Sequence, residues 1–398
     1  MTARGPLLCV LVDAFRHDYL DAVKTPFLAS VAAQGRSEPL PTILGYSDAV
    51  RATIFTGAYP DEHGYWMEYR FSDGVADPFR PFSRMGALDA FPSDFVMRGA
   101  KFVLSATAMR ALARRRGYRS LDLRHIPFGA LRFFDYTLTT PMTAPRALSM
   151  PTIFDRMTDA GIGWVYLSSS EASDASIASQ IGNLPPETGL VFVYLHHLDM
   201  VSHLHGIAGP RFDRVLRETD RRVEQLASAV RDRLGDPEVL VFSDHGMSPA
   251  RRFVSLPGLR RHPAFGTAFW FALDATTVRL RYLRDDPEVV DELRTYVADR
   301  LPGRWLSEDQ RRAFRLPRDM RSWGDDVFLT EPGVVIFPNF HSYARPKAMH
   351  AYDPADRDQD GIVVASAGVK LPATPRLVDL FGAIERSAAL ADRLVERA

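Results

Sequence analysis

The chain of 398 residues contains only one cysteine, Cys9. No disulfide can form within it, and no zinc site can be built from several thiolates. Any metal ion must therefore be bound by histidine, aspartate and glutamate side chains. The lack of a disulfide framework is typical of a reducing compartment, so we expect a cytoplasmic protein.

Long hydrophobic runs are also missing. The first apolar run, Leu7 to Val12, is followed directly by Asp13. It is too short for a signal peptide or a membrane-spanning helix. No other run reaches spanning length without a charged residue, and we expect a soluble, intracellular chain.

An excess of charge of one sign is lacking too, because 49 basic residues face 49 acidic ones. Proteins that bind nucleic-acid polymers normally have a basic excess, so we do not expect a nucleic-acid polymer as a partner. Hydrophobic residues make up 46% of the chain, enough for a sizeable core. The length suits one large α/β domain with a smaller inserted one, or two domains.

Short apolar runs alternate with segments of helical spacing. The runs are typical of strands buried on both faces of a parallel sheet, and they cover 7–12, 163–167, 190–195, 239–242 and 333–337. Helical spacing occurs at 25–34, 47–56, 151–160 and 211–233. This alternation predicts an α/β fold with a doubly wound, mostly parallel sheet.

Two segments interrupt the alternation. Residues 70–148 are rich in Phe, Arg and Pro, and we interpret them as a lid-like insertion. Residues 267–324 combine alternating strands with a helix at 288–301 and predict a small α+β subdomain. The catalytic core would then consist of 1–266 and 325–398.

Carboxylates and imidazoles follow four of the predicted strands. They are Asp13, then Asp199 and His203, then Asp244 and His245, and finally His350. The carboxyl ends of strands form the binding crevice of an open α/β sheet, so these side chains should converge there. Each alone is more often a turn, a cap or an ordinary histidine. Together they suit zinc, and six ligands are enough for two ions.

Five motifs, in order, carry a family resemblance. They are Leu11 to Leu20, Ala52 to Gly64, Asp199 to His203 with Gly206 and Gly209-Pro210, Ser243 to Met247, and Met349 to Pro354. Their order and spacing resemble those of the nucleotide pyrophosphatase/phosphodiesterase family of the alkaline phosphatase superfamily. The resemblance extends from residue 7 to about residue 370, except in 70–148.

This resemblance implies a metal-dependent hydrolase of phosphate esters with two divalent ions, zinc being favoured and manganese the alternative. Asp13, Ser47, Asp244 and His245 would surround one ion, and Asp199, His203 and His350 the other. Ser47 would attack phosphorus and form a phosphoryl-Ser47 intermediate. Arg51, one helical turn further, would bind a phosphoryl oxygen. Without the ligand sets, Ser47 would be interpreted as an ordinary helix-capping serine.

The chain also departs from the family pattern. Serine replaces the usual threonine nucleophile, Glu68 replaces an asparagine that donates to the phosphoryl group, and Ala351 replaces a glycine. A phosphomonoesterase or phosphonate hydrolase therefore remains an alternative to a phosphodiesterase. Ser47 and Arg51 also resemble the sulfatase signature, in which the residue at 47 becomes formylglycine. A third alternative is an inactive module that binds a phosphorylated ligand.

Residues 96–119 form a basic helical candidate with several arginines among apolar residues. Peripheral contact with an anionic lipid surface is one interpretation, and a lid over the substrate is another. The ordinary alternative is a solvated helix with one apolar side packed on the core.

Overall fold

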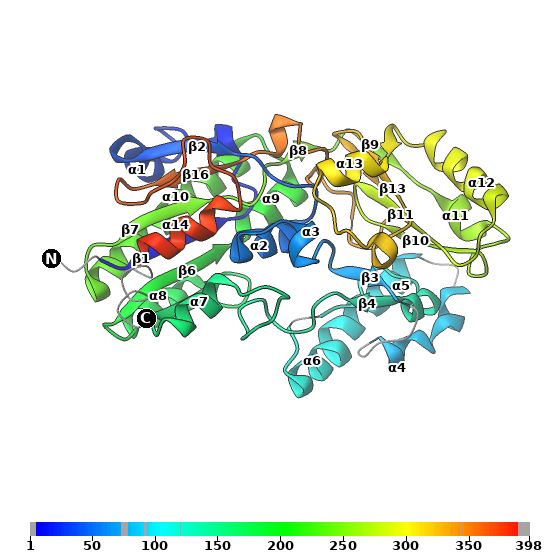
Figure 1. Cartoon of the computed structure of the whole chain (residues 1–398), viewed down its shortest axis with the longest axis horizontal. Coiled ribbons are helices and arrows are strands. Elements are labelled where there is room, and N and C mark those ends of the chain that lie inside the picture. The colour runs from blue at the N-terminus through cyan, green and yellow to red at the C-terminus, as the bar shows by residue number, and fades with distance from the viewer. Residues whose placement is uncertain (1–4, 73–78, 91–93, 120, 343, 389–398) are drawn as a thin grey trace. The chain divides into compact units, whose positions relative to one another are not determined.

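A computed structural model of the chain describes residues 5–72, 79–90, 94–119, 121–342 and 344–388. The chain divides into two compact units (Figure 1). The first consists of Met1–His63, Leu148–Pro249 and Lys347–Ala398, and the second of Gly64–Ala147 and Ala250–Pro346.

The first unit is built on a six-stranded sheet of order β2-β16-β7-β1-β6-β5. Strands β7 (Glu238–Phe242), β1 (Leu7–Val12), β6 (Thr188–Leu195) and β5 (Gly163–Ser168) are parallel. Strand β16 (Gly361–Ala365) runs antiparallel to β7 and to the edge strand β2 (Arg36–Leu40). The predicted α/β fold with a largely parallel sheet is therefore confirmed.

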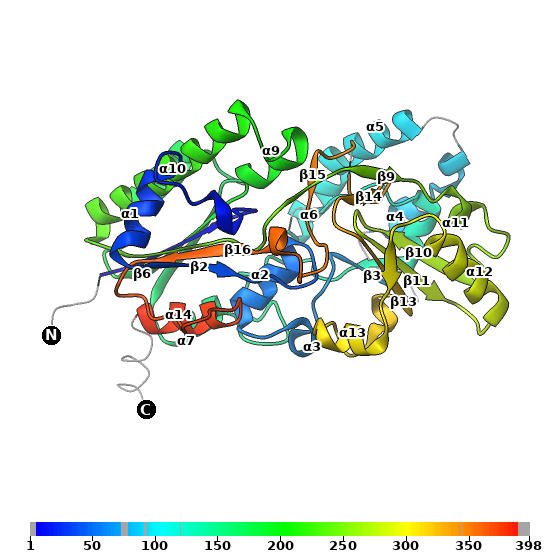
Figure 2. The same ribbon diagram turned by 90° about the horizontal axis from the view of Figure 1, so that it is seen from above.

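Helices cover both faces of this sheet (Figure 2). One face carries α1 (Pro26–Gln34), α9 (His197–His205) and α10 (Pro210–Leu234). The other carries α2 (Ser47–Thr56), α7 (Ile153–Asp159) and α14 (Asp379–Ser387). Strand β1 is buried along its whole length, which explains its continuous apolar run.

The second unit has its own sheet of order β10-β11-β13-β12, entirely antiparallel. Its strands are β10 (Phe269–Leu273), β11 (Thr277–Tyr282), β13 (Asp326–Thr330) and β12 (Gly303–Trp305). Helix α12 (Pro287–Ala298) connects β11 to β12. A β3 (Tyr69–Phe71) and β4 (Phe134–Tyr136) pair comes from the other segment of the unit.

The predicted domain boundaries differ from this division. The segment 267–324 supplies no strand to the main sheet, as expected, but it is only part of a larger unit that includes 64–147 and the flanks 250–266 and 325–346. The physical reason is a shared hydrophobic core. Phe71, Phe134 and Tyr136 belong to the same buried cluster as Phe271 and Phe328.

The strand predicted at 333–337 was assigned to the wrong sheet. Strand β14 (Val334–Ile336) pairs in parallel with β9 (Arg252–Val254) in the second unit. The main sheet is instead completed by β16, which the sequence patterns did not identify. A short run of buried apolar residues looks the same in the sequence whichever sheet the strand joins.

Residues 96–119 are helical over most of their length, as predicted. Helix α5 (Asp94–Leu104), a π-helical turn (Ser105–Met109) and α6 (Arg110–Arg116) follow one another. Their buried residues recur once per turn, at Lys101, Ser105, Met109 and Ala113. Most of this helical segment is therefore exposed.

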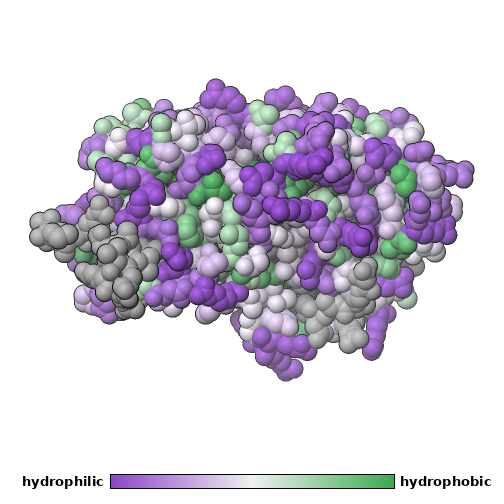
Figure 3. Space-filling model, viewed as in Figure 1, coloured by the Kyte–Doolittle hydropathy of each residue, from purple (hydrophilic) through white to green (hydrophobic). Residues whose placement is uncertain are grey.

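None of the helices within the described ranges is long and apolar enough to span a membrane. Hydrophilic residues predominate on the face shown in Figure 3, and hydrophobic residues form small separate patches there.

Candidate metal centre

All seven candidate ligands lie in the first unit, in the loops and helices that follow its strands. Asp13 follows β1, and Asp244 and His245 follow β7. Asp199 and His203 lie on α9, one turn apart, after β6. His350 follows β15 (Ala348–Met349), which pairs with β8 (Ser248–Pro249). That short ladder brings His350 back to the loop that carries His245.

The structure groups these residues into the two predicted sets. In the first set, ligand atoms of Asp13, Asp244 and His245 all lie within 4.8 Å of one another. In the second, those of Asp199, His203 and His350 do the same. The sets adjoin, because the rings of His245 and His350 are stacked with centroids 3.7 Å apart.

For two of the three histidines, a hydrogen bond of Nδ1 leaves Nε2 facing the centre. Nδ1 of His203 lies 2.8 Å from the carbonyl oxygen of Ala348. Nδ1 of His245 lies 2.9 Å from the carbonyl oxygen of Gly246. A carbonyl can only accept, so each Nδ1 carries a proton and Nε2 is the nitrogen that faces the candidate ligand set. Metal-binding histidines are commonly oriented in this way.

Three buried carboxylate oxygens of the two ligand sets lack a hydrogen-bond donor among the described residues. Oδ1 of Asp13, Oδ1 of Asp199 and Oδ2 of Asp244 are buried and accept no hydrogen bond from the residues that the structure describes. Buried acceptors without a donor are costly, and charged ones most of all. Three such oxygens beside imidazole nitrogens form a donor set that fits divalent cations.

The carboxylates also repel one another. Burial, together with the charges of Asp244 and Asp199, raises the pKa of Asp13 well above its usual value. Burial raises the pKa of Asp244 to about 7, although Arg51 opposes the shift. For His203, burial lowers the pKa, but Asp199 outweighs it and raises the value to about 9. The protein alone therefore does not balance the negative charge of the centre.

Ser47 is the first residue of α2, and Tyr46 rather than Ser47 is the helix cap. Its hydroxyl oxygen lies 3.0 Å from Nε2 of His245, within the first ligand set. The N-terminus of a helix favours an anion through its unpaired N–H groups and its dipole. The side chain predicted as the nucleophile is thus both close to the first ligand set and at an anion-binding helix end.

Arg51 lies one turn along α2 and pairs with Asp48. Its guanidinium also lies 4.7 Å from the ring centroid of Tyr194. The hydroxyl of Tyr194 donates to Oδ2 of Asp13. Arg51 is therefore connected to the first ligand set through Tyr194, while its predicted contact with a phosphoryl oxygen stays a prediction.

Sequence analysis missed Tyr194 and Ser243. The hydroxyl of Ser243 accepts from the backbone N–H of Phe15 and donates to the carbonyl of His245, so it fixes two loops of the centre. Tyr194 is the last residue but one of a buried apolar strand that ends just before the His196-His197 pair. A polar tip at the carboxyl end of such a strand is the signal that could have identified it.

The departures at Glu68 and Ala351 have structural explanations. In the second unit, Glu68 pairs with Arg124 at 3.2 Å and Arg119 at 3.5 Å, so its charge is compensated. Ala351 has a φ of 64°, in the left-handed region that favours glycine. The usual glycine of the family motif is thus explained by the backbone at this position.

Comparison with known proteins identifies the family. The model of the type I phosphodiesterase/nucleotide pyrophosphatase family matches residues 7–353. The chain belongs to this family. An uncharacterized pyrophosphatase/phosphodiesterase of Schizosaccharomyces pombe is 23% identical over 252 residues, which cover 62% of this chain and 45% of the yeast protein. The chain thus spans less than half the length of that relative.

Solved structures of ectonucleotide pyrophosphatase/phosphodiesterase 5 share the fold. The human protein superposes with a TM-score of 0.68 at 14% identity, covering 96% of this chain and 94% of the other. An inactive murine variant in complex with AMP gives a TM-score of 0.67 at 16% identity, with 96% and 95% covered. The family member described here therefore has the alkaline phosphatase-like fold that the sequence predicted.

Proposed function

We propose that this family member is a two-metal phosphodiesterase in which Ser47 is the nucleophile. The observation that carries the proposal is the position of the Ser47 hydroxyl, 3.0 Å from His245 Nε2 and at the start of α2. Family membership supports a phosphate ester as the substrate and speaks against the sulfatase alternative. The inactive murine variant was solved in complex with AMP. This supports a substrate in which one of the two groups esterified to the phosphate resembles a nucleoside.

Asp13, Asp244 and His245 would hold one divalent ion, and Asp199, His203 and His350 the other. Bound there, such ions supply Lewis acidity that lowers the pKa of a hydroxyl and neutralises charge on a leaving oxygen. Histidine and carboxylate ligands favour zinc, with manganese as the alternative.

The chain's own groups perform the remaining steps. The first turn of α2 attracts the phosphoryl oxygens, and Arg51 adds positive charge one turn further. The Ser47 oxygen then forms a bond to phosphorus while the bond to the leaving alcohol breaks. In the second step, water displaces the Ser47 oxygen from phosphorus, which restores the hydroxyl and releases a phosphate monoester.

A substrate panel tests the proposal. Metal-stripped protein is loaded with zinc or manganese and assayed on bis(4-nitrophenyl) phosphate, 4-nitrophenyl phosphate and 4-nitrophenyl sulfate. We expect the diester to be hydrolysed fastest and the sulfate slowest. The exposed-serine variant Ser179→Ala should retain the wild-type rate, whereas Ser47→Ala should not. Faster turnover of the sulfate would overturn the proposal, and a monoester preference would favour the phosphomonoesterase alternative.

A further inference from the structure

The second unit contains a cavity of about 620 Å³ that none of the candidate metal ligands lines. Its wall is formed by α5, by α11 (Pro257–Arg261), and by residues around 125–127 and 338–340. Small-molecule sites commonly have volumes of roughly 300–1,000 Å³. The cavity is thus large enough for a small organic ligand.

Basic side chains predominate among the charged residues described in this wall. They are Arg98, Lys101, Arg260 and Arg261, against a single carboxylate, that of Asp89. The Asp89 carboxylate already accepts from the backbone N–H groups of Phe128 at 2.9 Å and Gly129 at 2.7 Å. Among the described residues of the wall, the charge is therefore mostly positive, and the one carboxylate accepts hydrogen bonds from backbone N–H groups.

Lys101 is the most informative of these cations because its side chain is buried, with 5% exposure. Its ammonium donates to the carbonyl of Ile126 and lies 4.7 Å from the ring centroid of Phe128. Charge-assisted hydrogen bonds are among the strongest in proteins, especially where water is limited.

His125 also lines the cavity, and its pKa reflects the positive charges around it. Burial, together with the charges of Arg98 and Lys101, lowers the pKa of His125 to about 3. A neutral imidazole at pH 7 adds no further charge, but it can exchange one hydrogen bond with a ligand.

The rest of the wall is hydrophobic. Its apolar members include Met97, Leu256, Phe271, Leu273 and Phe340. A second cavity of about 470 Å³ shares Asp89, Pro127 and Arg260 with the first and adds Arg84 and Arg132. An occupant of the first cavity could therefore extend toward further basic groups.

We propose that this cavity binds an organic anion, in which a phosphate, sulfonate or carboxylate group is joined to an apolar body. The anionic group would be held by the planar, multi-donor guanidinium groups of Arg260 and Arg261, and the buried ammonium of Lys101 would add positive charge to the wall. The apolar body would pack against Phe271 and Leu273. This site is distinct from the proposed phosphodiesterase centre, because its lining residues include none of the seven ligands.

The probe for the test is 8-anilinonaphthalene-1-sulfonate, whose fluorescence rises on binding and which has the proposed chemistry. It is titrated into the metal-loaded full chain. We expect Arg261→Ala to weaken binding about five-fold and Arg261→Glu more, while Arg261→Lys retains most of the affinity. The matched control is Arg318→Ala, which removes an exposed arginine of the same unit outside the cavity.

A second arm excludes binding at the metal centre. The variant His203→Ala should bind the probe as tightly as wild type, because His203 does not line the cavity. Octyl phosphate and phosphatidylserine vesicles then compete for the probe's site. Competition by both indicates a lipid headgroup as the source of the anion, and competition by octyl phosphate alone indicates a free organic anion. Unchanged affinity in both Arg261→Ala and Arg261→Glu, or loss of binding in His203→Ala alone, would overturn the proposal.

Discussion

The imidazole rings of His245 and His350 lie nearly parallel, with an angle of 9° between their planes. One ring belongs to the first ligand set and the other to the second. Burial and the neighbouring His245 hold the pKa of His350 well below its usual value. The stack is therefore the point at which the two ligand sets meet.

Metal content should follow the two ligand sets. Elemental analysis of the metal-saturated protein should give two ions per chain, as expected of two-metal hydrolases. His203→Ala should leave one ion, because the set of Asp13, Asp244 and His245 is intact. His205→Ala removes an exposed histidine at the end of the same helix and should leave both ions. One ion or none at saturation in wild type would contradict the two-metal account.

Tyr194 should act as a positioning residue for Asp13, to which its hydroxyl donates. Tyr194→Phe should weaken metal binding about 10- to 100-fold, the usual effect of losing a partner that orients a ligand. Metal affinity is measured by competition with a chromogenic chelator, and activity should recover at high metal concentration. Tyr19→Phe is the control, since that buried hydroxyl makes no hydrogen bond to the described residues. Equal affinities in all three proteins would exclude this role.

The sequence pointed to the side chains that the structure brings together in the two ligand sets, but it missed parts of the fold around them. Asp13, Asp199, Asp244 and His245 follow or adjoin strands whose apolar runs identify them locally. The antiparallel strands β2 and β16 were missed because their pairing partners are distant in sequence, and β2 contains Arg, Ser, Glu and Pro. The sequence also did not show that two distant segments, Gly64–Ala147 and Ala250–Pro346, form the second unit together, and the reason is related. Its aromatic residues bury one another across two segments and show no local periodicity.

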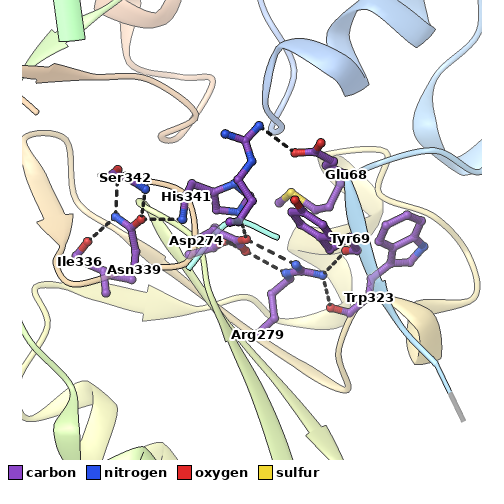
Figure 4. Close-up of polar contacts among 12 residues, drawn as sticks. Glu68, Tyr69, Asp274, Arg279, Trp323, Ile336, Asn339, His341 and Ser342 are labelled. Atoms are coloured by element: carbon purple, nitrogen blue, oxygen red, sulfur yellow. Dashed lines mark hydrogen bonds and ion pairs between the residues drawn. The ribbon is translucent and has the colours of Figure 1, made fainter. Parts of the chain in front are cut away.

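In the second unit, Arg279 and Asp274 form an ion pair in which both side chains are 1% exposed (Figure 4). Arg279 also donates to the carbonyl oxygens of Tyr69 and Trp323, so it connects three segments. Arg279→Met leaves the Asp274 carboxylate buried without its main partner and should cost about 3–5 kcal/mol of unfolding free energy. Chemical denaturation followed by circular dichroism measures this loss.

The control for that change is Arg281→Met on the same strand. Arg281 pairs with Asp325, but the two side chains are 21% and 31% exposed. Pairs that solvent reaches contribute little, so the loss should stay below about 1 kcal/mol. Similar losses of unfolding free energy in both variants would show that the burial of the Arg279–Asp274 pair does not determine its contribution to stability.

Stability should depend on pH through His63, which is 3% exposed. Burial lowers the pKa of His63 to about 4. The unfolded chain protonates histidine near pH 6.5, so the native state loses stability as pH falls from 6.5 toward 4, on the order of 1.4 kcal/mol per pH unit. His63→Gln cannot titrate. Measured in chelator, the stability advantage of wild type over this variant should therefore shrink as pH falls, and a constant difference would contradict the assignment.

The most direct test of the central claim is mass spectrometry of the peptide that contains Ser47, after acid quenching during turnover of a phosphodiester. The account predicts an adduct on Ser47 whose mass equals the phosphoryl group with its remaining ester, absent from Ser47→Ala and from protein without substrate. Ser47→Ala should lose nearly all turnover, on the order of 10⁶-fold, while it keeps both ions. Formylglycine at residue 47, or an active enzyme whose Ser47 never carries the adduct, would contradict the account.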